Sequence, residues 1–234
     1  GKRVFLTGHT GFKGSWLSLL LIEAGAELTG YSLAPQDTPN LFSLLHLTNE
    51  MRSIEGDVRD VSALNRAFYE AKPEIVLHLA AQPLVRESYR APRETFDTNV
   101  LGTVNLLECV RGANTVKSVV NVTTDKVYRN EEHNAAFREG DPLGGYDPYS
   151  SSKACSEIVT ESYRNSFLRA AGVAVSSARA GNVIGGGDFA RDRIIPDCVR
   201  AAYRKESIIV RNPASIRPYQ HVLDPLDGYL EIAR

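Results

Sequence analysis

The chain has 234 residues, of which 43% are hydrophobic and 24% charged, enough for one large domain or for one domain with a small annex. A net charge of −1 gives no basic field for nucleic acid or an anionic membrane, and the longest apolar run, around "SWLSLLLIEAGA", is too short to span a bilayer. Cys109, Cys155 and Cys198 have neither disulfide-framework nor metal-ligand spacing, so we expect no metal site and a reducing, cytoplasmic location.

Short β-rich runs alternate with amphipathic stretches along most of the chain. Strands are predicted at 3–8, 26–33, 51–58, 74–81, 118–124 and 173–183, and helices at 13–25, 62–72, 98–113 and 149–167. The run "EIVLHLAA" is almost continuously apolar, as expected for a strand buried on both faces. This alternation predicts an α/β fold of the Rossmann type, a doubly wound parallel sheet with helices on both faces.

The glycine-rich stretch "NVIGGGD" marks a change of pattern. We predict a dinucleotide-binding domain that carries the catalytic residues at 1–180, and part of a smaller substrate-binding lobe at 181–234. Gly1 opens directly onto a strand without a methionine, and Arg234 ends the chain inside a helical pattern. We therefore expect both ends to be trimmed and C-terminal sequence to be missing.

Gly8, Gly11 and Gly14 stand three apart in "LTGHTGFKG", directly after a strand and at the start of a helix. This spacing allows a tight turn, close approach of the backbone to a diphosphate and close packing of the helix on the strand. The helix N-terminus then supplies N–H groups and a positive dipole end. The pattern predicts a dinucleotide site, with a purely structural turn as the alternative.

The end of the second strand carries Ser32 where an acid often holds the adenosine ribose, and no arginine is placed for a 2′-phosphate. We therefore expect NAD in preference to NADP. Asp57 is predicted to accept a hydrogen bond from the adenine amino group. A helix-capping role is the alternative, although it better suits Asp60.

Tyr149 and Lys153 stand four apart in "YSSSK" on a predicted helix, so their side chains point the same way. An ammonium group beside a phenol favours the phenolate, and we expect Lys153 to lower the pKa of Tyr149. Tyrosine then becomes a usable base for a sugar or alcohol hydroxyl. A surface pair on a helix is the alternative.

Thr124, Asp125 and Lys126 follow the strand "SVVNV", at the carboxyl end where an open α/β sheet meets its ligands. We interpret them as catalytic groups. The alternative is that Asp125 caps a turn and Lys126 is an exposed charge at the strand end.

The motifs "TGHTGFKG", "LHLAAQ", "TTDKVY" and "YSSSK" occur in this order, and the chain resembles the extended short-chain dehydrogenase/reductase superfamily over essentially its whole length. The nucleotide-sugar 4,6-dehydratases of that superfamily carry Thr-Asp-Glu after the fifth strand, whereas the third residue here is Lys126. With "GHTGFKGSW", "GGYDPYSSSK", "AGNVIGGGD" and "IRPYQHVLDPL", this lysine makes the chain similar to the CDP-glucose 4,6-dehydratase family. That family is longer than this chain, in line with missing C-terminal sequence.

The resemblance implies that NAD takes a hydride from C4 of CDP-glucose, that water is lost across C5 and C6, and that the hydride returns to C6. Tyr149, paired with Lys153, would take the proton of the 4-hydroxyl. Asp125 would protonate the departing 6-hydroxyl, Lys126 would remove the C5 proton, and Thr124 would hydrogen-bond the 4-oxygen. Asp125 must be protonated and Lys126 neutral when they act.

Further positions are expected to bind cofactor or substrate. Small Ala80 and Ala81 would let the cofactor approach, with close helix packing as the alternative. Asn99 would support the tyrosine and lysine, with helix capping or helix bending as the alternative. The full cofactor set is Gly8, Gly11, Phe12, Gly14, Ser32, Asp57, Val58, Leu79, Ala80, Ala81, Gln82, Asn99, Tyr149 and Lys153. The substrate set is Gln82, Thr124, Asn182, Arg193, Arg217 and His221; the two arginines suit a diphosphate, or are surface charges.

Two further predictions concern the rest of the chain. The polar segment from about 129 to 148 is long for a loop, so we expect it to close over bound substrate. His46, His78 and His133 are expected to be structural or solvated.

Three functions stay open at this point. The dehydratase leads, because the pair Asp125 and Lys126 has no use in its nearest rival, a nucleotide-sugar 4-epimerase with the same tyrosine and lysine. A non-catalytic NAD-binding sensor or scaffold would be expected to lose the tyrosine or the lysine. We expect a nucleotide-sugar partner, no nucleic acid or membrane partner, and a homodimer or higher homo-oligomer.

Overall fold

The main sheet is parallel and has the predicted doubly wound topology. The computed structural model describes residues 1–36, 38–130 and 136–234. Within them the strand order is β3-β2-β1-β4-β5-β6, and β1 pairs with both β2 and β4. The order therefore reverses beside β1, which is the topological switch point where open α/β sheets bind ligands. The strands are β1 (Arg3–Thr7), β2 (Glu27–Ser32), β3 (Arg52–Glu55), β4 (Ile75–His78), β5 (Ser118–Val122) and β6 (Ala174–Ala178).

The four predicted helices lie close to their expected ranges, as α1 (Phe12–Glu23), α3 (Val61–Ala71), α6 (Gly102–Gly112) and α7 (Pro148–Tyr163). The helical pattern expected at the end of the chain is α9 (Leu223–Ala233), whereas α8 (Ile194–Arg204) was not predicted. The helix expected at 98–113 begins as a π-helical turn, η2 (Asp97–Leu101), before α6. The sequence did not indicate α2 (Leu41–Leu44), α4 (Val85–Arg90) and α5 (Pro92–Phe96), because elements this short show too few turns for a periodic pattern.

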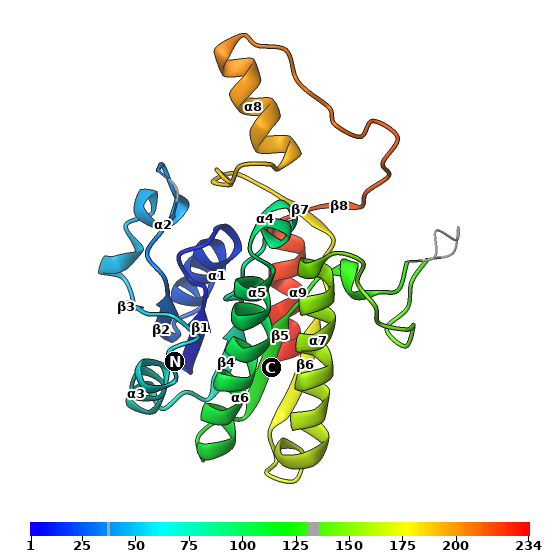
Figure 1. Cartoon of the computed structure of the whole chain (residues 1–234). Coiled ribbons are helices and arrows are strands. Elements are labelled where there is room, and N and C mark those ends of the chain that lie inside the picture. Colours follow the sequence, from blue (N-terminus) through cyan, green and yellow to red (C-terminus); the bar gives the residue numbers. More distant parts are fainter. Residues whose placement is uncertain (37, 131–135) are drawn as a thin grey trace.

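Helices cover both faces of the sheet (Figure 1). On β1, Phe5 packs in one apolar cluster, while Val4 and Leu6 pack in the other, as the two-residue period of a strand requires. The first cluster contains side chains of α3 and α6, such as Phe68 and Leu107. The second contains side chains of α1 and α9. The near-continuous apolar strands are thus explained by burial on both sides.

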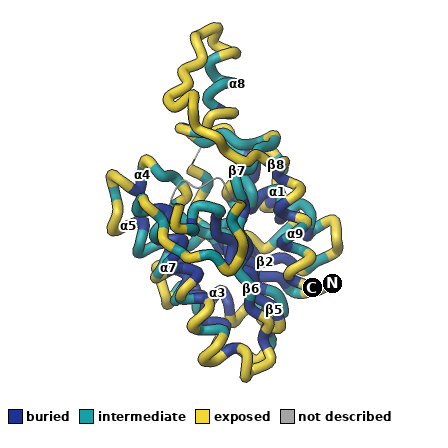
Figure 2. The backbone as a smooth tube through the Cα atoms, turned by 90° about the vertical axis from the view of Figure 1, so that its right-hand side faces the viewer, coloured by how far each residue is buried: buried dark blue, intermediate teal, exposed yellow. Residues whose placement is uncertain are grey.

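The C-terminal part of the chain divides between two places. β7 (Asn182–Ile184) and β8 (Tyr219–His221) form a separate parallel pair, and α8 stands away from the main sheet with much of its surface exposed (Figures 1 and 2). By contrast, α9 returns to the main sheet, where Leu226, Tyr229 and Ala233 are buried in the same cluster as α1. Since these residues recur at helical spacing, they form one apolar stripe. The division at residue 180 stays a prediction.

No helix in the described ranges has both the length and the apolar character needed to cross a membrane.

Candidate active site

The glycine turn between β1 and α1 has the packing that the sequence predicts. Gly8 has a positive φ of 78°, and a Cβ there would lie 2.7 Å from the backbone nitrogen of Ala80. A Cβ on Gly14 would lie 2.0 Å from the carbonyl oxygen of Gly8. Only glycine therefore fits at these two positions.

Gly11 differs, because its missing side chain is not required by the packing of the protein. A Cβ there would meet only the Gly8 carbonyl oxygen, at 3.5 Å, which is ordinary contact. Gly11 is also the N-cap of α1, and no side chain caps this helix end. The first N–H groups of α1 are thus open to an anion, as a diphosphate site requires.

The predicted ribose and adenine positions lie at the ends of β2 and β3. The hydroxyls of Ser32 and Thr10 are 2.9 Å apart, which places Ser32 beside the glycine turn. Asp57 accepts hydrogen bonds from the backbone and guanidinium of Arg59, and this hydrogen bonding holds the pKa of Asp57 below its ordinary value. Asp60, rather than Asp57, caps α3 by accepting from the Ala63 N–H at 3.0 Å. The capping assignment is confirmed, and the adenine contact stays a prediction.

The loop after β4 is held by Gln82 and Asn99. The Gln82 side chain donates to the Leu84 carbonyl and to the Thr95 hydroxyl, and it accepts from the Leu84 N–H at 2.6 Å. These bonds hold its amide against its own loop. Val58, also predicted to contact the cofactor, is buried against Gly102, where a Cβ would come within 2.7 Å of it.

Asn99 is buried in the π-helical turn and links three elements. It accepts from the Gln82 N–H at 2.8 Å and donates to the Gln82 carbonyl and to the Ser152 hydroxyl. Ser152 in turn donates to the Tyr149 carbonyl at 2.7 Å. Asn99 therefore supports the first turn of α7 through Ser152.

Tyr149 and Lys153 lie on the first turns of α7, and both are buried. Asp147 caps this helix by accepting from the Ser150 N–H at 2.9 Å, and Pro148 occupies its first position. The Lys153 ammonium donates to the Val122 carbonyl at 3.0 Å, which ties α7 to the end of β5.

The expected lowering of the Tyr149 pKa by Lys153 is wrong for this structure. Burial raises the pKa of Tyr149 to about 12, although a hydrogen bond with Thr124 acts in the other direction. Burial also lowers the pKa of Lys153 to about 8, opposed by the charge of Glu157. Removal from water outweighs the lysine's charge, because the lysine bonds to the Val122 carbonyl and is itself buried.

Thr124, Asp125 and Lys126 form a connected group at the carboxyl end of β5. The Asp125 carboxylate accepts from the Thr124 hydroxyl at 3.0 Å and from the Lys126 ammonium at 3.2 Å. Lys126 also donates to the side-chain oxygen of Asn182 at 3.3 Å. Thr124, rather than Asp125, caps the short 3-10 turn η3 (Asp125–Val127). Thr124 also acts to lower the pKa of Tyr149, so its hydroxyl lies close to both the tyrosine and the aspartate.

Sequence reasoning missed a buried ion pair behind this group. Glu157 lies one turn after Lys153, accepts from the Thr123 hydroxyl at 2.5 Å and pairs with Arg179, whose Nε is 2.9 Å from its Oε1. The Arg179 guanidinium also lies 4.7 Å from the ring centre of Tyr128. These contacts join α7, β6 and the turn η3. In "KACSE" Glu157 follows Lys153 by four residues, and this spacing could have placed Glu157 on the same side of the helix. Nothing in the sequence indicated that Arg179 is its partner.

The predicted substrate residues are only partly brought together. Asn182 lies beside Lys126, and Arg193 begins α8 in an ion pair of 3.0 Å with Asp188. Arg217 and His221 are exposed, and the His221 ring accepts from the Leu223 N–H at 3.3 Å, at the start of α9. Their expected contacts with a diphosphate stay predictions.

The glycine-rich stretch after β7 packs over the start of α1. Trp16 donates from its indole nitrogen to the Gly186 carbonyl at 2.9 Å. A Cβ on Gly185 would lie 3.3 Å from the ring of Phe12, one of the predicted cofactor residues. Leu79 and Ala80 adjoin the two core clusters, and Ala81, the third of these residues after β4, is half-buried.

The long polar segment is described only in part, because residues 131–135 lie outside the described ranges. Arg129 and Pro142 are joined by a backbone hydrogen bond of 2.8 Å, and Tyr128 bridges to Leu143. Closure over substrate stays a prediction. His133 falls outside the described residues, whereas His78 is buried and hydrogen-bonds Thr7 and Thr103, as a structural histidine does.

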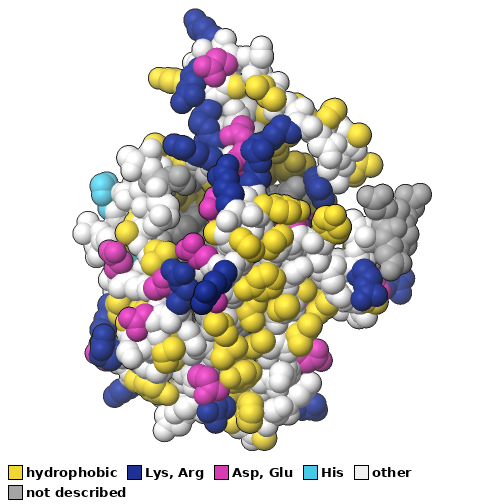
Figure 3. Space-filling view, in the orientation of Figure 1, with side chains coloured by type: hydrophobic (Ala, Val, Ile, Leu, Met, Phe, Trp, Pro, Cys, Tyr) yellow, Lys and Arg dark blue, Asp and Glu magenta, His cyan; other side chains and the backbone are white. Residues whose placement is uncertain are grey.

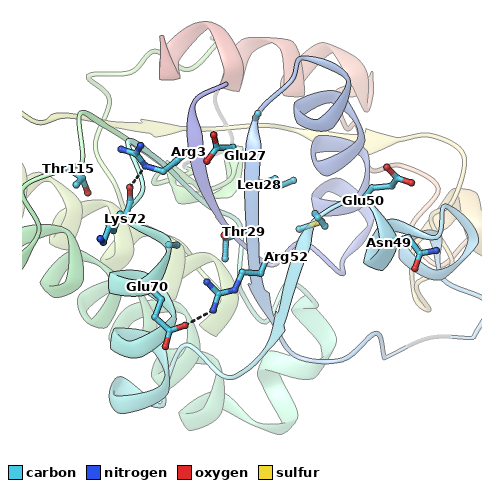
Figure 4. A pocket seen from close by; sticks show the side chains of 13 residues that line it. Arg3, Glu27, Leu28, Thr29, Asn49, Glu50, Arg52, Glu70, Lys72 and Thr115 are labelled. Carbon is cyan, nitrogen blue, oxygen red and sulfur yellow. Dashed lines mark hydrogen bonds and ion pairs between the residues drawn. The ribbon is translucent and has the colours of Figure 1, made fainter.

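The groove in Figure 4 lies at the opposite edge of the sheet from these residues. Arg3, Glu27 and Arg52 begin β1, β2 and β3, and they line it together with Lys72 and Glu70. Its charges are mixed, and Arg52 already pairs with Glu70. Ligands of an open parallel sheet bind at the carboxyl ends of its strands, so this groove is not the catalytic site.

Comparisons with known proteins identify the family of this chain. The model of the GDP-mannose 4,6 dehydratase family matches residues 5–234. A CDP-glucose 4,6-dehydratase from Salmonella typhimurium is 55% identical over 239 residues, covering 100% of this chain and 67% of that enzyme. The chain thus spans about two thirds of the length of this relative.

Solved structures share the fold over the whole chain. A double mutant of DesIV, a dTDP-glucose 4,6-dehydratase from Streptomyces venezuelae with NAD and DAU bound, has a TM-score of 0.85 at 27% identity, covering 99% of this chain and 70% of that one. A dTDP-glucose 4,6-dehydratase from Bacillus anthracis in complex with NAD has a TM-score of 0.86 at 23% identity, covering 100% and 72%. These likenesses confirm the predicted fold class.

Proposed function

We propose that this chain, which belongs to the GDP-mannose 4,6 dehydratase family within the extended short-chain dehydrogenases/reductases, carries the active site of an NAD-dependent hydro-lyase that converts CDP-glucose to CDP-4-keto-6-deoxyglucose and water. The single observation that carries the proposal is the hydrogen-bonded group Thr124, Asp125 and Lys126 at the end of β5, close enough to buried Tyr149 for Thr124 to affect its pKa. The choice of CDP-glucose is supported by the 55% identity with the Salmonella enzyme.

The glycine turn fits the cofactor. Gly11 leaves the uncapped start of α1 accessible, and Gly8 and Gly14 allow the strand and helix to approach closely. NAD, when bound, supplies the oxidation at C4 and the reduction at C6, so the overall reaction is redox-neutral. The proton transfers of the reaction are carried out by side chains of the protein.

Proton transfers account for the rest of the reaction. Tyr149 takes the proton of the sugar 4-hydroxyl, Lys126 removes the C5 proton, and Asp125 protonates the departing 6-hydroxyl. The observed ion pair of Asp125 and Lys126 differs from this acid and base only by the position of one proton between them. After the elimination, Lys126 returns its proton to C5.

One proton must still travel from Tyr149 to Asp125 before the next turnover. Thr124 donates to Asp125 and acts on the pKa of Tyr149, so its hydroxyl is the group placed to pass a proton between them. Burial holds the pKa of Tyr149 at about 12, so the phenolate needs positive charge nearby. The charge of Arg193 acts in that direction in this structure, and bound NAD⁺ would add a further positive charge.

The two rival functions are less well supported. A 4-epimerase shares the tyrosine, the lysine and the cofactor, but it has no use for an acid and a base at C5 and C6. A sensor or scaffold needs neither the tyrosine and lysine nor the acid and base. The connected Asp125 and Lys126 therefore favour the dehydratase.

The test is to incubate the protein with NAD and CDP-glucose in deuterated water, and to analyse the product by mass spectrometry and NMR. We expect loss of one water, deuterium at C5 and protium at C6, because the C5 proton passes through exchangeable Lys126 while the C6 hydrogen comes from C4. No product with CDP-, dTDP- or GDP-glucose would remove the dehydratase proposal. Comparing these three substrates also shows which nucleotide base the enzyme accepts.

We further propose a cytoplasmic homodimer. Figure 3 shows hydrophobic side chains gathered in a band over the face formed by α5, α6 and α7. Leu101 directly before α6, Ile158 in α7 and Phe167 just after α7 are 52%, 57% and 46% exposed. An exposed apolar band on a protein surface favours a partner. Light scattering should report a dimer that Ile158→Glu converts to a monomer. The cytoplasmic location is supported by three free thiols.

A further inference from the structure

Lys13 occupies an unusual place for a lysine. It lies in the first turn of α1, between Gly11 and Gly14 of the glycine turn, and its side chain is half-buried. Its ammonium donates to the Tyr229 hydroxyl at 3.3 Å and lies 5.6 Å from the centre of the same ring. An ammonium has three donors, and a phenol is a neutral partner.

Three other cations converge on Lys13 from separate elements. Burial, followed by the charges of Lys153 on α7, Arg193 at the start of α8 and Lys126 in η3, lowers the pKa of Lys13 to about 7. Figure 3 shows further Lys and Arg side chains gathered between α8 and the body of the molecule. Positive charges brought together in a partly desolvated place repel one another and attract an anion.

Lys13 differs from these neighbouring cations because its hydrogen-bond partner is the neutral hydroxyl of Tyr229. Lys126 pairs with Asp125 and Arg193 pairs with Asp188. Lys153 donates to the Val122 carbonyl and lies near Glu157. Within residues 1–36, 38–130 and 136–234, no ion pair includes Lys13. It is therefore the cation of this cluster best placed to take a negative charge from a ligand.

We propose that Lys13 is a further ligand-binding residue of this site, and that its ammonium takes a phosphate oxygen of a nucleoside diphosphate. The inference rests on the proposed function, which brings two diphosphates to this edge of the sheet, one in the dinucleotide and one in the nucleotide sugar. Lys13 shares its helical turn with the uncapped N–H groups of α1, so both can act on the same anion. A neutral side chain at this position would leave the cluster without that contact.

The experiment measures the dissociation constants of NAD, CDP and cytidine by calorimetry for wild type, Lys13→Met and Lys13→Arg. Loss of one charge-assisted hydrogen bond should weaken the diphosphate that contacts Lys13 by about tenfold, and arginine should restore it to within about threefold. Weaker NAD alone assigns the contact to the cofactor, and weaker CDP alone assigns it to the nucleotide sugar. Cytidine has no phosphate, so its affinity should not change.

Lys2→Met is the matched control, because it removes the same charge from an exposed lysine at the amino end of β1. Equal affinities of wild type and Lys13→Met for both NAD and CDP would overturn the inference while leaving the proposed function intact. A wild type that binds neither ligand would overturn both.

A second measurement needs no variant to fold. The Lys13 ammonium can be titrated by NMR in the wild-type protein, with and without the diphosphate it contacts. The titrating and charged groups that face it are Tyr229, Lys153, Lys126 and Arg193. Binding of an anion at Lys13 should raise its pKa from about 7 by at least about one unit, a tenfold change in proton affinity. An unchanged value in the saturated complex would overturn the inference, because a purely structural lysine would not respond.

Discussion

Replacing Asp125 by asparagine separates the chemistry of this residue from its contribution to stability. The asparagine keeps a side-chain oxygen that can accept from Thr124, but it cannot give a proton to the departing 6-hydroxyl. In the structure Asp125 makes a 3.2 Å ion pair with Lys126, and their side chains are 31% and 26% exposed. Solvent reaches both groups, so screening reduces the pair's worth.

The two expected magnitudes differ widely. A partly exposed ion pair contributes about 0.2–1 kcal/mol, so the free energy of unfolding should fall by less than about 1 kcal/mol. Loss of a general acid slows a reaction by about 10²- to 10⁴-fold. Turnover should therefore collapse in a protein of almost unchanged stability.

The assay follows product formation and, in the same samples, NADH absorbance, with urea unfolding in parallel. NADH should accumulate in Asp125→Asn, because C4 oxidation does not need the acid and the loss of water does. Glu161→Gln is the matched control, because it removes a 3.3 Å ion pair with Arg164 on α7 and should leave turnover unchanged. Full turnover in Asp125→Asn would refute the assignment, and so would a loss of activity matched by an equal loss of stability.

Three further predictions concern buried groups. In Lys153→Met the pH dependence of stability should change: the pKa of Lys153 is about 8 in the folded protein and 10.5 ordinarily, so the unfolded chain holds more protons between these values. Wild type should therefore gain about 2 kcal/mol over the variant from pH 7 to 9.5, and no gain in urea titrations would contradict this. Glu157→Gln should cost about 3 kcal/mol in the same assay, because Arg179 loses its buried counter-charge; a change below about 1 kcal/mol would refute it. Leu226→Ala should cost about 3 kcal/mol and lower the single melting transition, whereas a transition confined to a separate C-terminal unit would show that α9 is not part of the sheet's core.

Local patterns in the sequence are enough to predict where several residues of the site lie. The spacing of Gly8 and Gly14 specifies a tight strand-to-helix turn, because the clash of a Cβ is a matter of neighbouring backbone. The four-residue spacing of Tyr149 and Lys153 places both on one side of α7, because residues four apart are separated by about one helical turn. Thr124 follows β5, and its place at the carboxyl end of the sheet follows from the parallel topology.

Tertiary structure alone decides which groups meet across long stretches of chain and which are removed from water. Lys126 and Asn182 are 56 residues apart, and nothing in either segment specifies the 3.3 Å contact between them. The return of α9 to the main sheet puts Tyr229 beside Lys13, although the sequence placed them in different units. Burial raises the pKa of Tyr149, where local spacing predicted a lower one. Sequence periodicity thus determines the elements and the side on which a residue lies, whereas the dielectric surroundings and partners of a charge depend on packing between distant segments.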